Sequence, residues 1–177
     1  DKLKEVIKGK SSTDGITNIQ LGLADIEHHM LHFLDNHDEQ RLASAEFAGI
    51  AENGKPLMVV STTISSAPTM VYFGQEVGEA GNENAGFGKP SRTSIFDYIG
   101  VPNHQRWMNN GKFDGGQLTP KEKELRDFYK RLLNFSLTSS ALMGNFMEIH
   151  SFQAKDKGYG DTLYSFARWD AKERLIV

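Results

Sequence analysis

The sequence predicts an α/β fold with parallel strands. Two short apolar runs, residues 30–35 and 69–74, read as buried strands, and a segment of helical character precedes each of them. Nearly continuous apolar runs are typical of strands in a parallel sheet that is covered on both faces, and alternation of helices with strands favours parallel pairing. The length of 177 residues is sufficient for one domain with a hydrophobic core.

Composition narrows the functional class. The formal net charge is −3, so the chain has no basic surface of the kind that binds nucleic acid. It has no cysteine, which excludes disulfides and thiolate metal sites. The longest apolar run, "PLMVV", is too short to span a bilayer, so no membrane partner is expected. The N-terminal residues lack the features of a signal peptide.

The first secondary-structure elements are predicted from the spacing of apolar residues and from turn-forming residues. Residues 1–8 predict a helix because their apolar positions share one face, and the turn residues at 9–15 end it. The run "MLHFLD", at 30–35, predicts a short and almost fully buried strand. Residues 43–53 predict a short helix that ends near Gly54.

The next segment is ambiguous by composition. Residues 56–66 are rich in β-branched side chains and favour a strand by propensity alone. Pro56 suits a first helical turn, however, and Pro68 ends the segment, so a buried helix is predicted. A strand then follows at 69–74. Residues 78–118 show no clean period and are rich in glycine, which predicts a long loop that is functional or an insertion.

The most strongly predicted helix begins at Thr119. Thr119 is suited to cap it, Pro120 occupies the first helical position, and Glu122 completes a capping box. Five apolar residues then share one face at helical spacing: Leu125, Phe128, Tyr129, Leu132 and Leu133. Beyond residue 143, short strand-like runs separated by turns predict an antiparallel sheet.

Each end of the sequence falls inside a predicted helix or strand. The first residues lie inside a helical pattern, and "RLIV" stops within a strand-like run. We therefore expect the chain to be a portion of a longer polypeptide. Strands with open edges and two apolar faces also lead us to expect that the isolated chain self-associates.

Polar side chains follow both predicted strands. The first strand continues into "DNHDEQR" at 35–41, and the second ends in "GQE" at 74–76. Catalytic side chains of parallel α/β folds lie where strands reach their C-terminal ends, so these two stretches form the candidate site.

In this order, the two stretches closely resemble the last part of the catalytic barrel of the α-amylase family, glycoside hydrolase family 13. Residues 33–38, "FLDNHD", fill the family's seventh-strand motif F-x-x-N-H-D. Residues 72–76, "YFGQE", match the aromatic residue, glycine and acidic residue that commonly end its eighth strand. A final barrel helix and a C-terminal antiparallel β domain follow in the family, so the resemblance covers nearly the whole chain.

The resemblance implies an α/β fold: the C-terminal portion of a (β/α)8 TIM barrel, about strands seven and eight with their helices, followed by part of an antiparallel β domain. Residues 1–140, with the loop 78–118, would belong to the barrel, and residues 141–177 would begin a truncated β domain. The implied reaction is cleavage of α-glucosidic bonds in starch or maltooligosaccharides with retention, which requires two carboxyl groups beside the scissile bond.

The resemblance also implies roles for individual residues. Asp38 matches a third carboxylate, which grips the hydroxyls of the sugar under attack and stabilises the transition state. His37 would donate a hydrogen bond to the same sugar. Asn36 and Arg41 belong to the implied substrate-binding set and position the loop, and Glu76 would orient the rim of the barrel.

The departures from the family are equally informative. Residues 1–29 lack the G-x-R-x-D pattern that carries the nucleophile, and neither the nucleophile nor the acid of the family matches a residue here. The isolated chain is therefore expected to be inactive. No cofactor is implied for this chain, although the resemblance allows calcium in the complete enzyme and slightly favours an extracellular or periplasmic location. Residues 69–73 carry no basic side chain, which argues against chloride activation.

Several alternatives remain open. His28 and His32 have the spacing of two helical metal ligands, but their segment enters a predicted strand rather than a helix, which disfavours a metal site. The aromatic residues Tyr98, Trp107 and Phe113 suit either sugar stacking or packing within the loop. The chain also fits a non-catalytic sugar-binding or interaction module on the same fold, or a transglycosylase of the same family.

Overall fold

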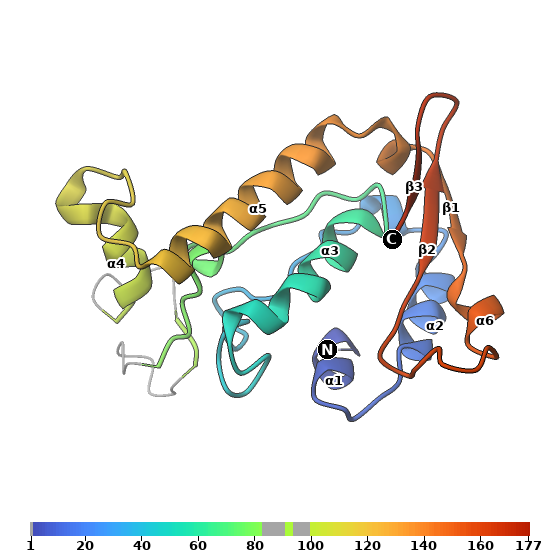
Figure 1. Cartoon of the computed structure of the whole chain (residues 1–177), viewed down its shortest axis with the longest axis horizontal. Helices are drawn as coiled ribbons and strands as arrows, with labels where there is room; N and C mark the ends of the chain where they lie inside the picture. Colours follow the sequence, from blue (N-terminus) through green and yellow to red (C-terminus); the bar gives the residue numbers. More distant parts are fainter. Residues whose placement is uncertain (1, 83–90, 94–99) are drawn as a thin grey trace. The chain divides into compact units, whose positions relative to one another are not determined.

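The computed structural model describes residues 2–82, 91–93 and 100–177. Its contacts divide the chain into two compact units, which are described separately (Figure 1). The sheet unit comprises Asp1–His32, Val60–Thr69 and Asn134–Val177. The motif unit comprises Phe33–Val59 and Met70–Leu133, and it contains most of both motif stretches. Residues 1–32, 60–69 and 134–140, which the sequence analysis assigns to the barrel, thus share a compact unit with the C-terminal strands.

The sheet unit is built on a three-stranded antiparallel sheet. Its strands β1 (Asn145–Glu148), β2 (Phe166–Trp169) and β3 (Arg174–Ile176) pair in the order β1-β2-β3. The antiparallel pairing predicted beyond residue 143 is therefore present. Three helices accompany the sheet in this unit: α1 (Lys2–Ile7), α2 (Asp14–Leu23) and α6 (His150–Gln153). Ile16, Ile64 and Phe166 form its buried core cluster.

The predicted strands at 30–35 and 69–74 are reduced to one parallel bridge. His32 pairs with Thr69, and the His32 amide donates to the carbonyl of Pro68 at 2.9 Å. The prediction of an almost fully buried strand is also wrong, since Met30 is 36% exposed and Leu31 is 49% exposed. A strand of this composition needs neighbours on both edges and cover on both faces. The described residues supply these runs with a single parallel partner.

The described residues also form short helices of about one turn. Their bounds are η1 (Glu27–His29), η2 (Ala51–Gly54), η3 (Gln75–Val77), η4 (Asn109–Gly111) and η5 (Ser140–Met143). The short helix predicted over 43–53 is wrong, because the chain makes turns up to the one-turn helix η2. Gly49 adopts a left-handed φ of 79°, which interrupts a helix.

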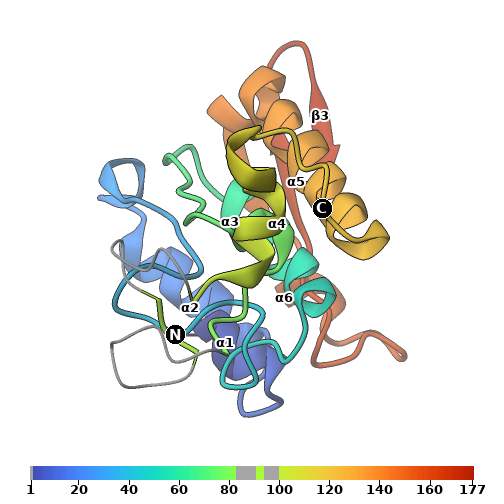
Figure 2. The ribbon, with the colours of Figure 1, turned by 90° about the vertical axis from the view of Figure 1, so that its left-hand side faces the viewer.

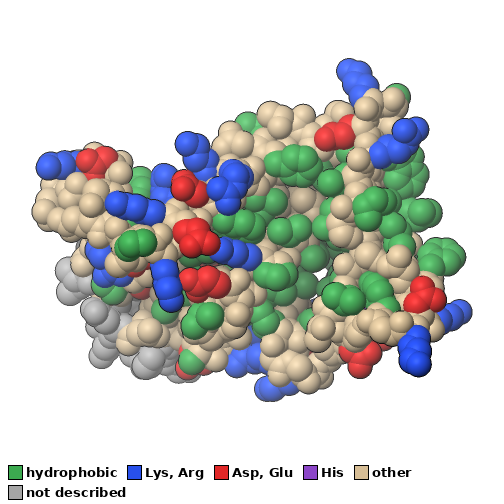
Figure 3. Space-filling model, in the orientation of Figure 1, with side chains coloured by type: hydrophobic (Ala, Val, Ile, Leu, Met, Phe, Trp, Pro, Cys, Tyr) green, Lys and Arg blue, Asp and Glu red, His purple; other side chains and the backbone are tan. Residues whose placement is uncertain are grey.

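Three predicted helices are present: the helix predicted over 1–8 is α1, and the two others each contribute residues to both units. The helix predicted over 56–66 is α3 (Lys55–Thr63), and the helix predicted from Thr119 is α5 (Pro120–Thr138). The capping box of α5 closes in both directions. The Thr119 amide donates to Glu122 Oε2 at 2.8 Å, and the Glu122 amide donates to Thr119 Oγ1 at 3.3 Å. Figure 3 shows charged side chains of both signs gathered over the N-terminal half of this helix.

The apolar face of α5 is narrower than predicted. Leu125 and Tyr129 are buried, at 3% and 2% exposure, whereas Phe128, Leu132 and Leu133 are half-buried. We expect Leu125→Ala to lower the free energy of unfolding by about 2–5 kcal/mol, because it removes a fully buried side chain. Leu132→Ala should lower the free energy of unfolding by a clearly smaller amount. Urea denaturation of both variants measures the difference, and equal losses would contradict the assigned faces.

A helix that the sequence did not predict lies within the segment 78–118. Helix α4 (Pro102–Met108) has proline in its first turn, and its N-terminal amides meet a distant carboxylate. Glu79 Oε2 accepts hydrogen bonds from the amides of Asn103 at 2.9 Å and His104 at 3.3 Å. Arg106 then donates to the Glu122 carboxylate at the start of α5. Figures 1 and 2 show α4 and the start of α5 side by side.

No helix among the described residues is both long and apolar enough to cross a bilayer.

Candidate functional site

The polar residues of the first motif form a tight turn, Asn36–Glu39, which we call the motif turn. The side chain of Asn36 builds it, since Asn36 Oδ1 accepts hydrogen bonds from the amides of Asp38 at 2.8 Å and Glu39 at 2.9 Å. Asparagine is favoured in such turns because its amide oxygen replaces a backbone acceptor. Asn36 therefore positions the loop, as the sequence predicts.

His37 and Asp38 project from the motif turn into solvent. Their side chains are 58% and 72% exposed, and His37 Nε2 lies 3.2 Å from Asp38 Oδ2. A cation approaches from the other side, with Arg92 Nη2 at 3.8 Å from Asp38 Oδ1. Exposed ion pairs contribute little to stability, so these side chains are not needed to hold the fold. Both side chains are accessible from solvent.

A buried ion pair lies directly behind the motif turn. Asp35 and Arg41, which flank the turn in sequence, are both fully buried, with Arg41 Nε 3.3 Å from Asp35 Oδ2. The same carboxylate oxygen accepts the amide of Leu42 at 2.8 Å. Because this pair joins both ends of the turn, it fixes where His37 and Asp38 leave the fold.

Arg41 also ties the first motif stretch to the second. Its Nη2 donates to the carbonyl of Phe73 at 2.6 Å, and its Nη1 donates to Thr93 Oγ1 at 2.9 Å. The guanidinium carbon lies 4.8 Å from the ring centre of Tyr72 and 5.3 Å from that of Phe73. Aromatic faces attract a desolvated cation, which strengthens this arrangement. The two stretches, more than thirty residues apart in sequence, are thus held together.

The pKa of Asp35 depends both on its burial and on its charged partner Arg41. Burial raises the pKa of Asp35, while the Arg41 guanidinium and the Leu42 amide act in the opposite direction. The charge of Glu76 raises the pKa of Asp35 further. Asp35 depends on Arg41 for compensation of its charge, because water does not reach it.

Two predicted site residues, Arg41 and Glu76, lie outside the motif turn and are fully buried or half-buried. Arg41 is fully buried, so it holds the loop and does not offer its guanidinium to a ligand. Glu76 is half-buried in η3, and its charge acts on Asp35 and on His104. Asn36, His37 and Asp38 lie together in the motif turn.

Other residues at this site were not singled out from the sequence. Arg92 is brought near Asp38 because the Arg41 amide donates to the carbonyl of Ser91 at 2.6 Å. His104 packs edge-on against Phe73 with ring centres 5.1 Å apart, and burial lowers the pKa of its imidazole. Both residues lie far along the chain from the motif turn, and no local pattern marks either of them.

The observed contacts bear on two alternatives from the sequence analysis: sugar stacking by aromatic residues and metal binding by histidines. Trp107 stacks on His104 with ring centres 5.6 Å apart, and Arg126 lies over its ring, so Trp107 serves packing. Phe113 remains 57% exposed, and Tyr98 lies outside the described residues. His32 contacts the Ser61 carbonyl at 3.1 Å, and the described residues hold no cluster of three side chains suited to a metal ion.

No family model matches the sequence, and no curated protein matches it. We therefore derive the function from the two motif stretches and from the geometry that joins them.

Proposed function

We propose that this chain is part of an α-amylase-type glycoside hydrolase and that its motif turn binds α-glucans. In this proposal the chain supplies the C-terminal portion of the catalytic barrel, about strands seven and eight, and the beginning of the β domain. The parallel bridge between His32 and Thr69 supports this, because strands seven and eight of such a barrel pair in parallel.

The observation that carries the proposal is the contact of Arg41 with the second motif. In a barrel enzyme, site residues from neighbouring strands must converge at one edge. Arg41 donates to Phe73, and its guanidinium lies beside the Tyr72 ring, so it joins the stretch that ends in Asp38 to the stretch that ends in Glu76. The joined stretches leave His37 and Asp38 exposed while their supports are buried.

The exposed pair has the chemistry that sugar binding requires. The Asp38 carboxylate accepts hydrogen bonds from sugar hydroxyls, and His37 is able to donate one. During cleavage, positive charge develops on the sugar ring, so a carboxylate on its hydroxyls stabilises the transition state more than the ground state. In this proposal the nucleophile and the general acid come from polypeptide outside these 177 residues.

Binding to the isolated chain tests the proposal without requiring catalysis. We expect maltotriose to bind weakly, as measured by isothermal titration calorimetry, and Asp38→Asn to weaken binding by about tenfold, since hydrogen bonds to charged groups are the stronger ones. Glu39→Gln is the matched control, because Glu39 is an exposed carboxylate on the same turn. If both substitutions weakened maltotriose binding equally, the loss would reflect the net charge of the turn and not a specific contact of Asp38. Unchanged binding in Asp38→Asn would contradict the proposal.

A further inference from the structure

The motif unit contains a cavity that none of the motif-turn residues lines. Its volume is about 330 Å³, which is within the range of small-molecule sites. Four parts of the chain form it: the segment before α3, the end of η3 with the residues after it, the start of α4, and the start of α5. The polar and charged members of its lining are Glu52, Asn82, Asn103, Thr119, Lys121 and Glu122.

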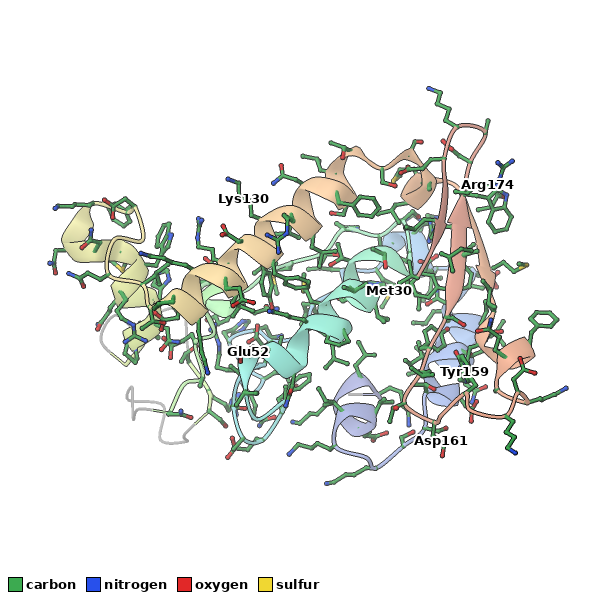
Figure 4. The ribbon with its side chains drawn as sticks, viewed as in Figure 1. Met30, Glu52, Lys130, Tyr159, Asp161 and Arg174 are labelled. Atoms are coloured by element: carbon green, nitrogen blue, oxygen red, sulfur yellow. The ribbon has the colours of Figure 1, made fainter. Side chains whose placement is uncertain are left out.

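The charges around the cavity balance. Glu122 is compensated by Arg106, which donates to both of its carboxylate oxygens. Glu52, which lies just before α3 (Figure 4), contributes one negative charge, and Lys121 contributes one positive charge. An ionic ligand would therefore meet a like charge as well as an opposite one. A neutral ligand that both donates and accepts hydrogen bonds suits this lining better.

The rest of the lining is small and aliphatic. Ala43, Ala51, Val77 and Leu125 provide apolar surface, and no aromatic side chain belongs to the described lining. A flat aromatic ligand would thus have no ring on which to stack. A sugar ring has C–H groups on its faces and hydroxyls at its edge, which matches apolar surface bordered by carboxylate, amide and ammonium groups.

A glycine keeps the cavity open. Gly78 has a φ of 76°, and a Cβ placed there would lie 3.0 Å from the Ala51 Cβ and 3.3 Å from Leu125 Cδ2. The side-chain Nδ2 of Asn103 holds Gly78 in place by donating a hydrogen bond to the Gly78 carbonyl at 3.1 Å. A side chain at this position would narrow the cavity between its two walls.

We propose that this cavity is a second saccharide site, one that takes a mono- or disaccharide as a neutral polyhydroxylated ligand. The site is independent of the role assigned to Asp38, because it shares no lining residue with the motif turn. It would hold a sugar unit without acting on it, because Glu122 is already engaged by Arg106 and Glu52 alone does not supply the two carboxyl groups that glycoside cleavage requires.

The test is an NMR titration of the full chain with glucose and with maltose. Amide signals of Ala51, Gly78 and Lys121 should shift with a common, millimolar Kd. Glu52→Gln should weaken this binding by about tenfold. Gly78→Ala should abolish it, and Glu52→Gln tests the site even if Gly78→Ala does not fold. The affinity should not change between low and high salt, because the ligand is neutral.

Matched controls separate this site from the motif turn. Glu46→Gln removes an exposed carboxylate that is not part of the lining and should leave the affinity unchanged. Asp38→Asn should also leave these shifts intact, even if the function proposed for the motif turn fails. The inference is overturned if glycine or inorganic phosphate binds more tightly than the sugars. It is also overturned if these amides do not respond, or if their response disappears in Asp38→Asn and persists in Glu52→Gln.

Discussion

Asp38→Asn in the proposed glycoside hydrolase is expected to lower turnover on starch about a thousandfold or more and to leave folding intact. The exposure of Asp38 accounts for the expected effect on folding. Asp38 is 72% exposed, and its charged neighbours are the exposed His37 and the half-buried Arg92, so little stability depends on its side chain. Asparagine keeps the shape of the side chain but loses the negative charge that opposes the charge developing on the sugar ring.

The measurement is kcat on soluble starch, together with thermal unfolding of both proteins. Glu39→Gln again serves as the control, because it removes a carboxylate from the same turn without touching the residue assigned to the sugar. Near-normal turnover of Asp38→Asn would contradict the assignment. A large fall in the unfolding temperature would show that Asp38 supports the fold instead.

The largest effect on stability is expected from Arg41→Met. This substitution removes the buried partner of Asp35 and the donors to Phe73 and Thr93. Breaking a buried pair leaves an uncompensated charge, so we expect a loss of about 3–5 kcal/mol in the free energy of unfolding at neutral pH. Arg131→Met, at an exposed position on α5, should change it by much less.

The loss in Arg41→Met should depend on pH with a defined sign. Burial already raises the pKa of Asp35, and removing Arg41 removes the main opposing influence. The folded state then prefers protonated Asp35, so the variant is relatively most stable below the unfolded pKa of the group and loses stability as pH rises through the folded pKa. Urea denaturation at acidic and neutral pH measures this. Adding Asp35→Asn should recover much of the loss, and a pH-independent deficit without recovery would contradict the account.

Local sequence chemistry predicted the long helix and the antiparallel sheet well. For α5, the capping residues Thr119 and Glu122 lie three positions apart, so the signal is contained in one turn. Pro56 likewise marks the first turn of α3, although its β-branched residues favour a strand by propensity. In both cases the groups that fix the helix end lie within the segment itself.

The helices that the sequence did not predict depend on distant partners. The amides of α4 are met by Glu79, more than twenty residues earlier in the chain. Helix α2 contains Gly15, where a Cβ would lie only 2.6 Å from Cδ of the Lys2 side chain. Gly15 lowers the helix propensity of this segment, and its close approach to the Lys2 side chain is a tertiary contact that local rules do not detect.

The candidate site was predictable in its exposed part only. The motif F-x-x-N-H-D marks Asn36, His37 and Asp38, and these three residues do share one turn. The motif does not show that Arg41 is buried or that Asp35 is its partner, because burial is decided by the rings of Tyr72 and Phe73. The support of the site therefore becomes visible only in three dimensions.

The central claim is tested most directly by the coding sequence upstream of residue 1, where the proposal places the missing catalytic carboxylates. Retaining cleavage requires a nucleophile and a general acid, and the proposal places both upstream of the motif turn. Reading the coding sequence on that side should reveal an aspartate within G-x-R-x-D and, one strand later, a glutamate. A natural polypeptide in which both carboxylates are missing would contradict the assignment as a glycoside hydrolase and would favour a sugar-binding module without catalysis.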